Sequence, residues 1–337
     1  MILVTGGTGL VGAHLLYHLC KKHKNIIAIY RSKASQKNTH HVFQLYGDTK
    51  NYKHIVWKKA DIIDIPSLTP VFKDVTKVYH AAAMVSFHPK DAGAMRKVNI
   101  EGTANVVNLC LEFNISKLCF VSSIATLSKK PGVQWMDETS DWNPEEDHSD
   151  YSISKYGAEM EVWRGAQEGL PVAIVNPGVI FGFGMWHANT SNLFVKISKG
   201  FPFYTKGVTG VVAVEDVVKA MELLMESSLK NIRFVLVNQN LSFLQLFTLI
   251  ANSLQATPPK LHAKKWLTEL LWRINEVVSL LTFRTYYSAL NKYSTRSSHQ
   301  KSFYNGTLIK KSVAFNYTPF EHSIKTIASK LLKSNNS

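Results

Sequence analysis

Residues 2–12 read Ile2-Leu3-Val4-Thr5-Gly6-Gly7-Thr8-Gly9-Leu10-Val11-Gly12, and this stretch decides the fold. A short apolar run, a turn of glycines and an apolar-periodic stretch to Cys20 predict a strand, a tight turn and a helix. Glycines at this spacing permit the turn, let backbone approach a diphosphate and let the helix pack on the strand. The alternative is a glycine-rich turn with a purely structural role. In its strand–helix context, the stretch predicts a dinucleotide site where helix amides stabilise negative charge.

The next predicted strand indicates which dinucleotide is bound. Residues 25–30 are mostly apolar, and the strand ends at Arg31, followed by Ser32 and Lys33. Folds that prefer NAD usually place an acidic residue here, which holds the ribose 2′-hydroxyl. Two cations instead suit a 2′-phosphate, through charge-assisted hydrogen bonds. We therefore expect NADP, with NAD as the alternative; the structural alternative is a solvated basic loop.

Strands and helices alternate through the first half of the chain. Strands are expected at residues 55–57, 77–83, 117–123 and 172–177, and residues 98–113 have helical periodicity. This order predicts an α/β fold: a Rossmann-type doubly wound parallel sheet with helices on both faces. Ligands of such sheets bind outside the carboxyl ends of the strands.

The length and composition suit a globular enzyme with two lobes. The chain has 337 residues, of which 45% are hydrophobic and 19% charged. We expect residues 1–180 and about 210–240 to form the dinucleotide-binding domain. A smaller, mostly C-terminal substrate-binding lobe would comprise residues 181–209 and about 241–337. Aromatic residues in 181–209 suggest an apolar substrate wall, although core packing explains them as well.

The net charge of +15 is uneven. Residues 256–337 carry thirteen Lys and Arg against three Glu. Residues 266–290 have apolar positions at helical spacing, with Lys264, Lys265, Arg273 and Arg284 nearby. This pattern is most often a lobe contact or a subunit contact, as in a homodimer, and it also suits a peripheral contact with anionic lipid. The structural alternative for the basic charge is a solvated face. No nucleic-acid-binding signature accompanies the charge, so we expect a small-molecule substrate and no nucleic acid.

Other patterns narrow the class further. The three cysteines, Cys20, Cys110 and Cys119, lack metal or redox spacing, and no His-Glu-x-x-His occurs, so we expect no metal. No leader pattern or run of about 18 apolar residues is present. We therefore expect a cytoplasmic protein with reduced cysteines and no transmembrane helix.

Three residues predict a catalytic set. Ser123 closes a predicted strand, and Tyr151 and Lys155 share one face of a predicted helix. A tyrosine ionises near pH 10, and we expect the lysine ammonium one turn away to lower its pKa. Tyr151 would then exchange a proton with a carbonyl or alcohol while Ser123 holds the reacting oxygen. Ser122 is the alternative serine, and Thr126 is expected either to assist it or to pack.

These motifs, in this order, resemble an extended short-chain dehydrogenase/reductase of the NAD(P)-dependent epimerase/dehydratase superfamily, strongly to about Gly184 and loosely beyond. The resemblance implies an adenine contact at Asp61 and Ile62 and a cofactor wall at 80–83, with His80 a wall residue and not a base. It implies that Ser123, Tyr151, Lys155 and Asn99 are catalytic, Asn99 by supporting the site and a proton relay. With Arg31 and Lys33, the expected cofactor-binding residues are Thr5, Gly6, Thr8, Gly9, Leu10, Val11, Gly12, Asp61, Ile62, Ala81, Ala82, Ala83, Tyr151, Lys155, Pro177, Gly178 and Val179.

The motif from Tyr151 to Glu159 looks most like the dihydroflavonol reductase and 3β-hydroxysteroid dehydrogenase branch. That likeness implies hydride transfer between NADP(H) and an alcohol or carbonyl substrate, with Tyr151 as the acid/base. A nucleotide-sugar epimerase or dehydratase with tightly bound NAD(P) is the alternative, and a non-catalytic NADP-binding sensor or scaffold is a further one. Asn176 stands where this family frequently has arginine, which puts a diphosphate-sugar contact there in doubt. Asp216 is expected to cap a helix.

Overall fold

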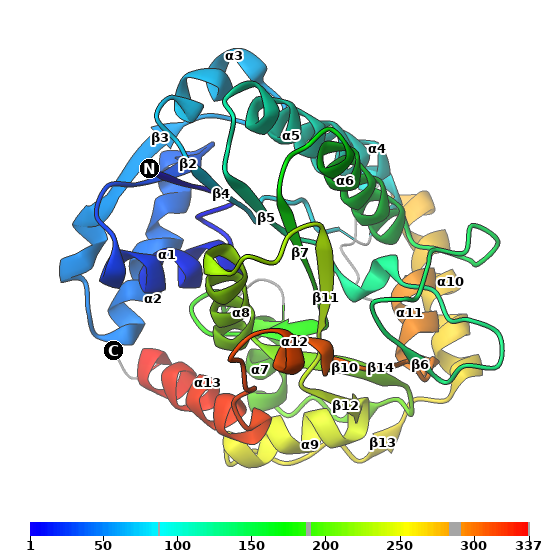
Figure 1. Ribbon diagram of the computed structural model, residues 1–337. Coiled ribbons are helices and arrows are strands. Elements are labelled where there is room, and N and C mark those ends of the chain that lie inside the picture. Colours follow the sequence, from blue (N-terminus) through cyan, green and yellow to red (C-terminus); the bar gives the residue numbers. More distant parts are fainter. Residues whose placement is uncertain (87, 187–189, 283–290, 336–337) are drawn as a thin grey trace.

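A computed structural model describes residues 1–86, 88–186, 190–282 and 291–335, and its centre is a sheet of seven parallel strands (Figure 1). The strand order is β11-β7-β5-β4-β1-β2-β3. The predicted Rossmann-type doubly wound parallel sheet is therefore confirmed. The strands are β1 (Ile2–Thr5), β2 (Ile26–Tyr30), β3 (Ile55–Lys59), β4 (Lys77–His80), β5 (Lys117–Val121), β7 (Val172–Pro177) and β11 (Ile232–Leu236).

Both faces of this sheet are buried because successive strand residues point to opposite sides. In β5, Cys119 packs into the apolar cluster beneath one layer of helices, whereas Leu118 and Phe120 pack into the cluster on the other face. Two helical layers therefore sandwich the sheet (Figure 1). The first layer contains α1 (Leu10–Lys22), α2 (Gln36–Tyr46) and α8 (Val214–Glu226), and the second contains α5 (Gly102–Glu112) and α6 (Asp150–Gln167).

A smaller three-stranded sheet lies beside the central one, with β10 (Val208–Ala213) between β8 (Val179–Phe181) and β12 (Gln239–Ser242). A third apolar cluster joins it to α7 (Ser191–Ser198), α9 (Phe243–Ser253) and α13 (Phe320–Asn335). The remaining elements are short strands and peripheral helices. They are α3 (Ile65–Leu68), α4 (Ala92–Arg96), β6 (Trp135–Met136), β9 (Phe203–Tyr204), β13 (Leu261–His262), α10 (Lys265–Thr282), α11 (Lys292–His299), β14 (Phe303–Tyr304) and α12 (Leu308–Ser312).

The amphipathic stretch expected at residues 266–290 falls partly on α10, and its part from 283 to 290 lies outside the described residues. Within the described ranges, no helix has the length and hydropathy needed to cross a bilayer.

Asp216 does not cap α8, so this expectation is wrong. Ala213 is the residue before the helix, and Asp216 lies inside the first turn. Its carboxylate accepts hydrogen bonds from the backbone amide of Thr318, at 3.1 Å, and from the Thr318 hydroxyl, at 2.9 Å. The carboxylate therefore ties α8 to the segment that precedes α13, a contact between positions far apart in the sequence.

Candidate active site

The glycine-rich turn connects β1 to α1 as the sequence predicts. Gly6 has φ +71°, in the left-handed region, and its carbonyl accepts a hydrogen bond from the Gly9 amide at 2.9 Å. Gly9 precedes α1, and no side chain caps the helix there. Because the first amides of a helix have no acceptors within it, this turn fits a diphosphate group.

Two of these glycines are required by close approach. A Cβ on Gly6 would lie 2.5 Å from the Ala82 nitrogen, and one on Gly12 would lie 2.1 Å from the Gly6 carbonyl oxygen. Gly9 is less crowded, since its Cβ would meet that oxygen at 3.3 Å. The cradle therefore depends sterically on Gly6 and Gly12, while Gly9 leaves open backbone toward a ligand.

Replacing Gly12 with alanine is expected to destabilise the fold by about 1–3 kcal/mol and to weaken dinucleotide binding, because the turn must move to admit the methyl group. Urea denaturation and NADPH fluorescence titration measure the two effects. Gly93→Ala in α4 is the matched control: no atom lies within 4 Å of its Cβ, so stability should stay the same or rise. Equal stability and affinity in both variants would contradict the steric argument.

A pocket of about 230 Å³ opens at the carboxyl ends of β1 to β4. Several residues predicted to bind the cofactor line it: Gly6, Thr8, Gly9, Arg31, Asp61, Ile62, Ala81, Ala82 and Ala83. The sequence analysis did not name four further lining residues, Ile29, Tyr30, Ala60 and Val98. Ile29, Tyr30 and Ala60 lie at the ends of β2 and β3, and a strand-end argument extended by one or two positions finds them, whereas Val98 lies in the π-helical turn before α5.

Other predicted cofactor residues lie outside this lining. Thr5 is buried, and its hydroxyl shares a 2.6 Å hydrogen bond with His80 and accepts one from the Ala82 amide at 3.3 Å. Thr5 thus holds the 81–83 segment. Lys33 lies in a short helical turn and lines a neighbouring depression with Lys37 and His40. Leu10, Val11 and Gly12 form the start of α1, and Pro177, Gly178 and Val179 lie where β7 passes into β8.

His80 is a wall residue with both ring nitrogens engaged. Its Nδ1 contacts the Thr5 hydroxyl and its Nε2 contacts the Thr103 hydroxyl at 3.0 Å. Burial and, to a lesser extent, the positive charge of Lys155 together lower the pKa of His80 to about 3. A neutral imidazole that holds two hydroxyl groups is therefore structural.

Ser123, Tyr151 and Lys155 meet where β5 ends and α6 begins. Ser123 starts a short helical turn, and its Oγ accepts a hydrogen bond from the Ala125 amide at 3.1 Å. Tyr151 lies in the first turn of α6 and shares a side-chain hydrogen bond with Ser123. One turn later, the buried Lys155 donates from Nζ to the Val121 carbonyl oxygen at 2.8 Å.

The charge states of this set differ from the expectation. Burial raises the pKa of Tyr151, and only the hydrogen bond with Ser123 opposes the rise. Burial lowers the pKa of Lys155 to about 8, while the negative charge of Glu159 raises it. The prediction that Lys155 lowers the pKa of Tyr151 is therefore wrong for this structure, in which the phenol is neutral at pH 7.

Asn99 is buried in a π-helical turn, Lys97–Glu101, directly before α5. Its Oδ1 accepts from the Met84 amide at 2.7 Å, and its Nδ2 donates to the Met84 carbonyl oxygen and to the Ser154 hydroxyl, both at 2.9 Å. Ser154 adjoins Lys155 on α6. Asn99 thereby joins the segment after β4 to the helix that carries Tyr151, and irregular π turns of this kind are frequent at functional sites.

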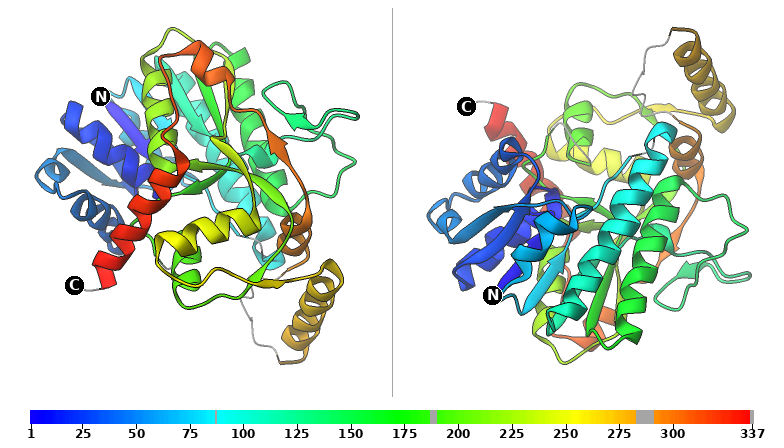
Figure 2. Two further views of the ribbon diagram at one scale, coloured as in Figure 1. Left: turned by 90° about the horizontal axis from the view of Figure 1, so that it is seen from below. Right: turned by 90° about the horizontal axis from the view of Figure 1, so that it is seen from above.

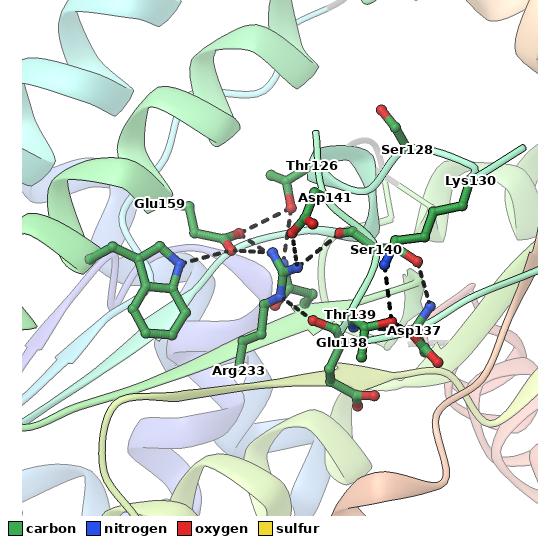
Figure 3. Close-up of polar contacts among 12 residues, drawn as sticks. Thr126, Ser128, Lys130, Asp137, Glu138, Thr139, Ser140, Asp141, Glu159 and Arg233 are labelled. Atoms are coloured by element: carbon green, nitrogen blue, oxygen red, sulfur yellow. Dashed lines mark hydrogen bonds and ion pairs between the residues drawn. The ribbon is translucent and has the colours of Figure 1, made fainter. Parts of the chain in front are cut away.

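A buried carboxylate that the sequence analysis did not assign, Glu159, contacts Thr126 and Arg233 (Figure 3). It organises the turn around Ser123. Glu159 Oε2 accepts hydrogen bonds from Ser122 at 2.5 Å, Thr126 at 3.0 Å and Asn176 at 2.8 Å. Ser122 and Thr126, considered above as substrate contacts, are buried and engaged here. Asn176 also donates to the Ser123 carbonyl oxygen at 3.2 Å.

Arg233 of β11 provides the positive charge for this carboxylate. Its Nη1 lies 3.2 Å from Glu159 Oε1. Its other nitrogens donate to the carbonyl oxygens of Glu138, at 2.9 Å, and Ser140, at 2.8 Å (Figure 3). Two features of the sequence could have indicated the Glu159–Arg233 pair. Arg233 lies within an otherwise apolar strand, and Asn176 stands where the family frequently has an arginine.

The fold and this arrangement define a Rossmann-type α/β protein with a dinucleotide cradle and a Ser–Tyr–Lys set. The family model "NAD dependent epimerase/dehydratase family" matches residues 2–236, and the chain belongs to that family. The predicted family, and with it the class of NAD(P)-dependent enzymes, is confirmed. The relatives of this chain include proteins named as reductases and proteins named as epimerases.

A putative dihydroflavonol 4-reductase of Synechocystis sp. is 26% identical over 78% of this chain and 75% of its own length. A UDP-glucose 4-epimerase of Vibrio cholerae is 29% identical over 62% of this chain and 60% of its own. Among solved structures, UDP-glucose 4-epimerase of Thermotoga maritima with UDP-glucose superposes with a TM-score of 0.77 at 19% identity, covering 99% of each chain. This last likeness concerns the fold.

Proposed function

We propose that the protein is an NADP(H)-dependent reductase that interconverts a carbonyl compound and its alcohol. The observation that carries this proposal is the geometry of the set: Tyr151, in the first turn of α6, is hydrogen-bonded to Ser123, and the buried Lys155 lies one turn later on the same helix. A protonated phenol held beside Ser123 can donate its proton to a carbonyl oxygen as negative charge develops there. The reductase relative supports the same direction.

In this mechanism each residue has one task. Ser123 holds the carbonyl oxygen within reach of Tyr151, which donates its proton to that oxygen. The Lys155 ammonium stabilises the tyrosinate that remains, and Asn99 positions α6 through Ser154. Bound nicotinamide would supply the hydride, and the Gly6–Gly12 cradle and the 230 Å³ pocket fit its dinucleotide.

The proposal includes the division of the chain and its location. Residues 1–180 and about 210–240 would bind the dinucleotide, and residues 181–209 and 241–337 the substrate. The apolar cluster shared by α7, α9 and α13, which all come from residues 181–209 and 241–337, supports this division. A cytoplasmic location is supported by three cysteines that are free and buried, Cys20, Cys110 and Cys119.

A direct test is titration with NADPH and NADH, followed by a fluorescence screen of ketones, aldehydes and nucleotide sugars for oxidation of the bound nicotinamide. Oxidation by a carbonyl compound, with NADPH preferred, is expected. An epimerised or dehydrated nucleotide sugar without net cofactor oxidation would contradict the proposal and favour the epimerase activity for which the Vibrio relative is named.

Replacing Arg31 with aspartate should weaken NADPH binding by about 10–100-fold and leave NADH binding within a few-fold, because a charge-assisted contact to the 2′-phosphate is lost. The two dissociation constants measure this. Lys33→Ala is the matched control, since Lys33 lines the neighbouring depression and not the pocket that Arg31 lines. An unchanged ratio of the two constants in Arg31→Asp would remove the argument for NADP.

A further inference from the structure

Helix α10 presents an apolar face to solvent. Trp266, Leu270, Leu271 and Ile274 are between 46% and 65% exposed. Positions separated by four, five and eight residues fall on one side of a helix, so these four side chains form a continuous stripe. We call this stripe the outer face of α10. Large exposed apolar patches generally mark an interaction site.

The opposite side of α10 is attached to the protein. The buried Thr268 hydroxyl shares a 2.9 Å hydrogen bond with the His299 ring of α11. Arg296 of α11 pairs with Glu269, at 3.7 Å, and with Asp147 in the segment before α6. The helix projects from the body of the molecule (Figure 2). Its attachment on one side directs the outer face away from the fold.

The chain just before α10 is also exposed and apolar. Leu261 of β13 pairs with Phe203 of β9, and these side chains are 53% and 44% exposed. Both strands belong to the part of the chain that the proposal assigns to the substrate lobe. The outer face of α10 therefore has an apolar neighbour in the sequence.

The charges around the outer face are mainly positive. Lys260, Lys264, Lys265 and Arg273 are all exposed, and the described segment 260–276 contains two acidic residues. One of them, Glu269, already pairs with Arg273 at 2.7 Å. Long cationic side chains beside an apolar stripe can extend to anionic groups while their stems stay on apolar surface.

We propose that the outer face of α10 is a docking surface for an anionic phospholipid bilayer. An amphipathic helix with tryptophan and leucine on one side and cations beside them lies in the plane of the interface, where the apolar stripe enters the acyl boundary and the cations meet the phosphate groups. Two copies of this chain would instead bring these cations, on a protein of net charge +15, against each other. The charge therefore favours the lipid surface over a second copy.

Co-sedimentation with vesicles tests this. Wild-type protein is expected to sediment with phosphatidylcholine vesicles that contain phosphatidylserine, and to do so less at high salt. The double variant Trp266→Ala/Leu270→Ala should lose about tenfold or more of its partition coefficient. The variant Lys264→Gln/Lys265→Gln should lose the dependence on phosphatidylserine. Ile65→Ala, at an exposed apolar position on α3, is the matched control and should bind as wild type.

Three outcomes would overturn the proposal. The first is no sedimentation with phosphatidylcholine vesicles, whether or not they contain phosphatidylserine. The second is binding that does not change with the phosphatidylserine content or with the α10 substitutions. The third is a concentration-dependent dimer in analytical ultracentrifugation, lost in Trp266→Ala/Leu270→Ala, without vesicle binding; a second copy would then be the partner. All five substituted residues are exposed, so thermal unfolding should be unchanged. Sedimentation does not depend on turnover, and the outcome is therefore separate from that of the proposed function.

Discussion

Replacing Tyr151 with phenylalanine is expected to lower kcat by about 10²–10⁴-fold, the usual contribution of a positioned general acid. The phenyl ring keeps the packing in the first turn of α6. The glycine cradle around Gly6 is formed by the turn between β1 and α1, which does not include Tyr151. NADPH affinity should therefore stay within a few-fold of wild type. Single-turnover kinetics and fluorescence titration measure the two quantities.

The control for this substitution lies on the same helix. Tyr156→Phe removes a hydroxyl one turn further along α6, where the ring of Tyr156 stacks on Trp142 with centroids 4.5 Å apart. Its kcat should remain near wild type. A Tyr151→Phe variant that turned over any carbonyl substrate at a near-normal rate would show that the proton comes from another group.

The second large effect is expected at Glu159, where alanine should cost about 3–5 kcal/mol of stability. Among the described residues, the largely buried Arg233 would then keep only the exposed Asp141, at 3.6 Å, as an ion-pair partner. Ser122, Thr126 and Asn176 lose their shared acceptor in the same variant. Urea denaturation measures the loss.

Glu161→Ala is the control for Glu159→Ala, since Glu161 pairs with Arg164 near the surface of the same helix and such pairs contribute about 1 kcal/mol or less. In Glu159→Gln the packing is kept, and the pKa of Lys155 should fall below about 8 because Glu159 raises it. Since protonated Lys155 stabilises the tyrosinate in the proposed mechanism, the alkaline limb of kcat/KM should move to lower pH. Equal losses of stability in both alanine variants would contradict the central role of the Glu159–Arg233 pair.

The parts of the site that the sequence predicts are those encoded locally. The glycine spacing from Gly6 to Gly12 and the four-residue spacing from Tyr151 to Lys155 translate directly into a turn and a helix face. Strand ends were predictable as well, because apolar runs stop where the pocket begins, as at Arg31. These features need no knowledge of distant contacts.

What the sequence does not predict depends on distant contacts. Glu159 and Arg233 are 74 positions apart and meet only because β11 pairs beside β7. Burial, which depends on the whole fold, decides the pKa of Tyr151 against the nearby cation. Lys33 is two positions from Arg31, yet a short helical turn carries it into another depression.

The position of Arg233 has a consequence for how the protein is made. Strand β11 is an edge of the central sheet and is the last of its strands to be synthesised. While a nascent chain still holds residue 233 inside the ribosome, Glu159 lacks its counter-ion and the turn at Ser123 lacks one of its anchors. The Rossmann core can begin to assemble around β1 to β5 during translation, but the turn at Ser123 reaches its final form only after the edge strand has emerged and paired.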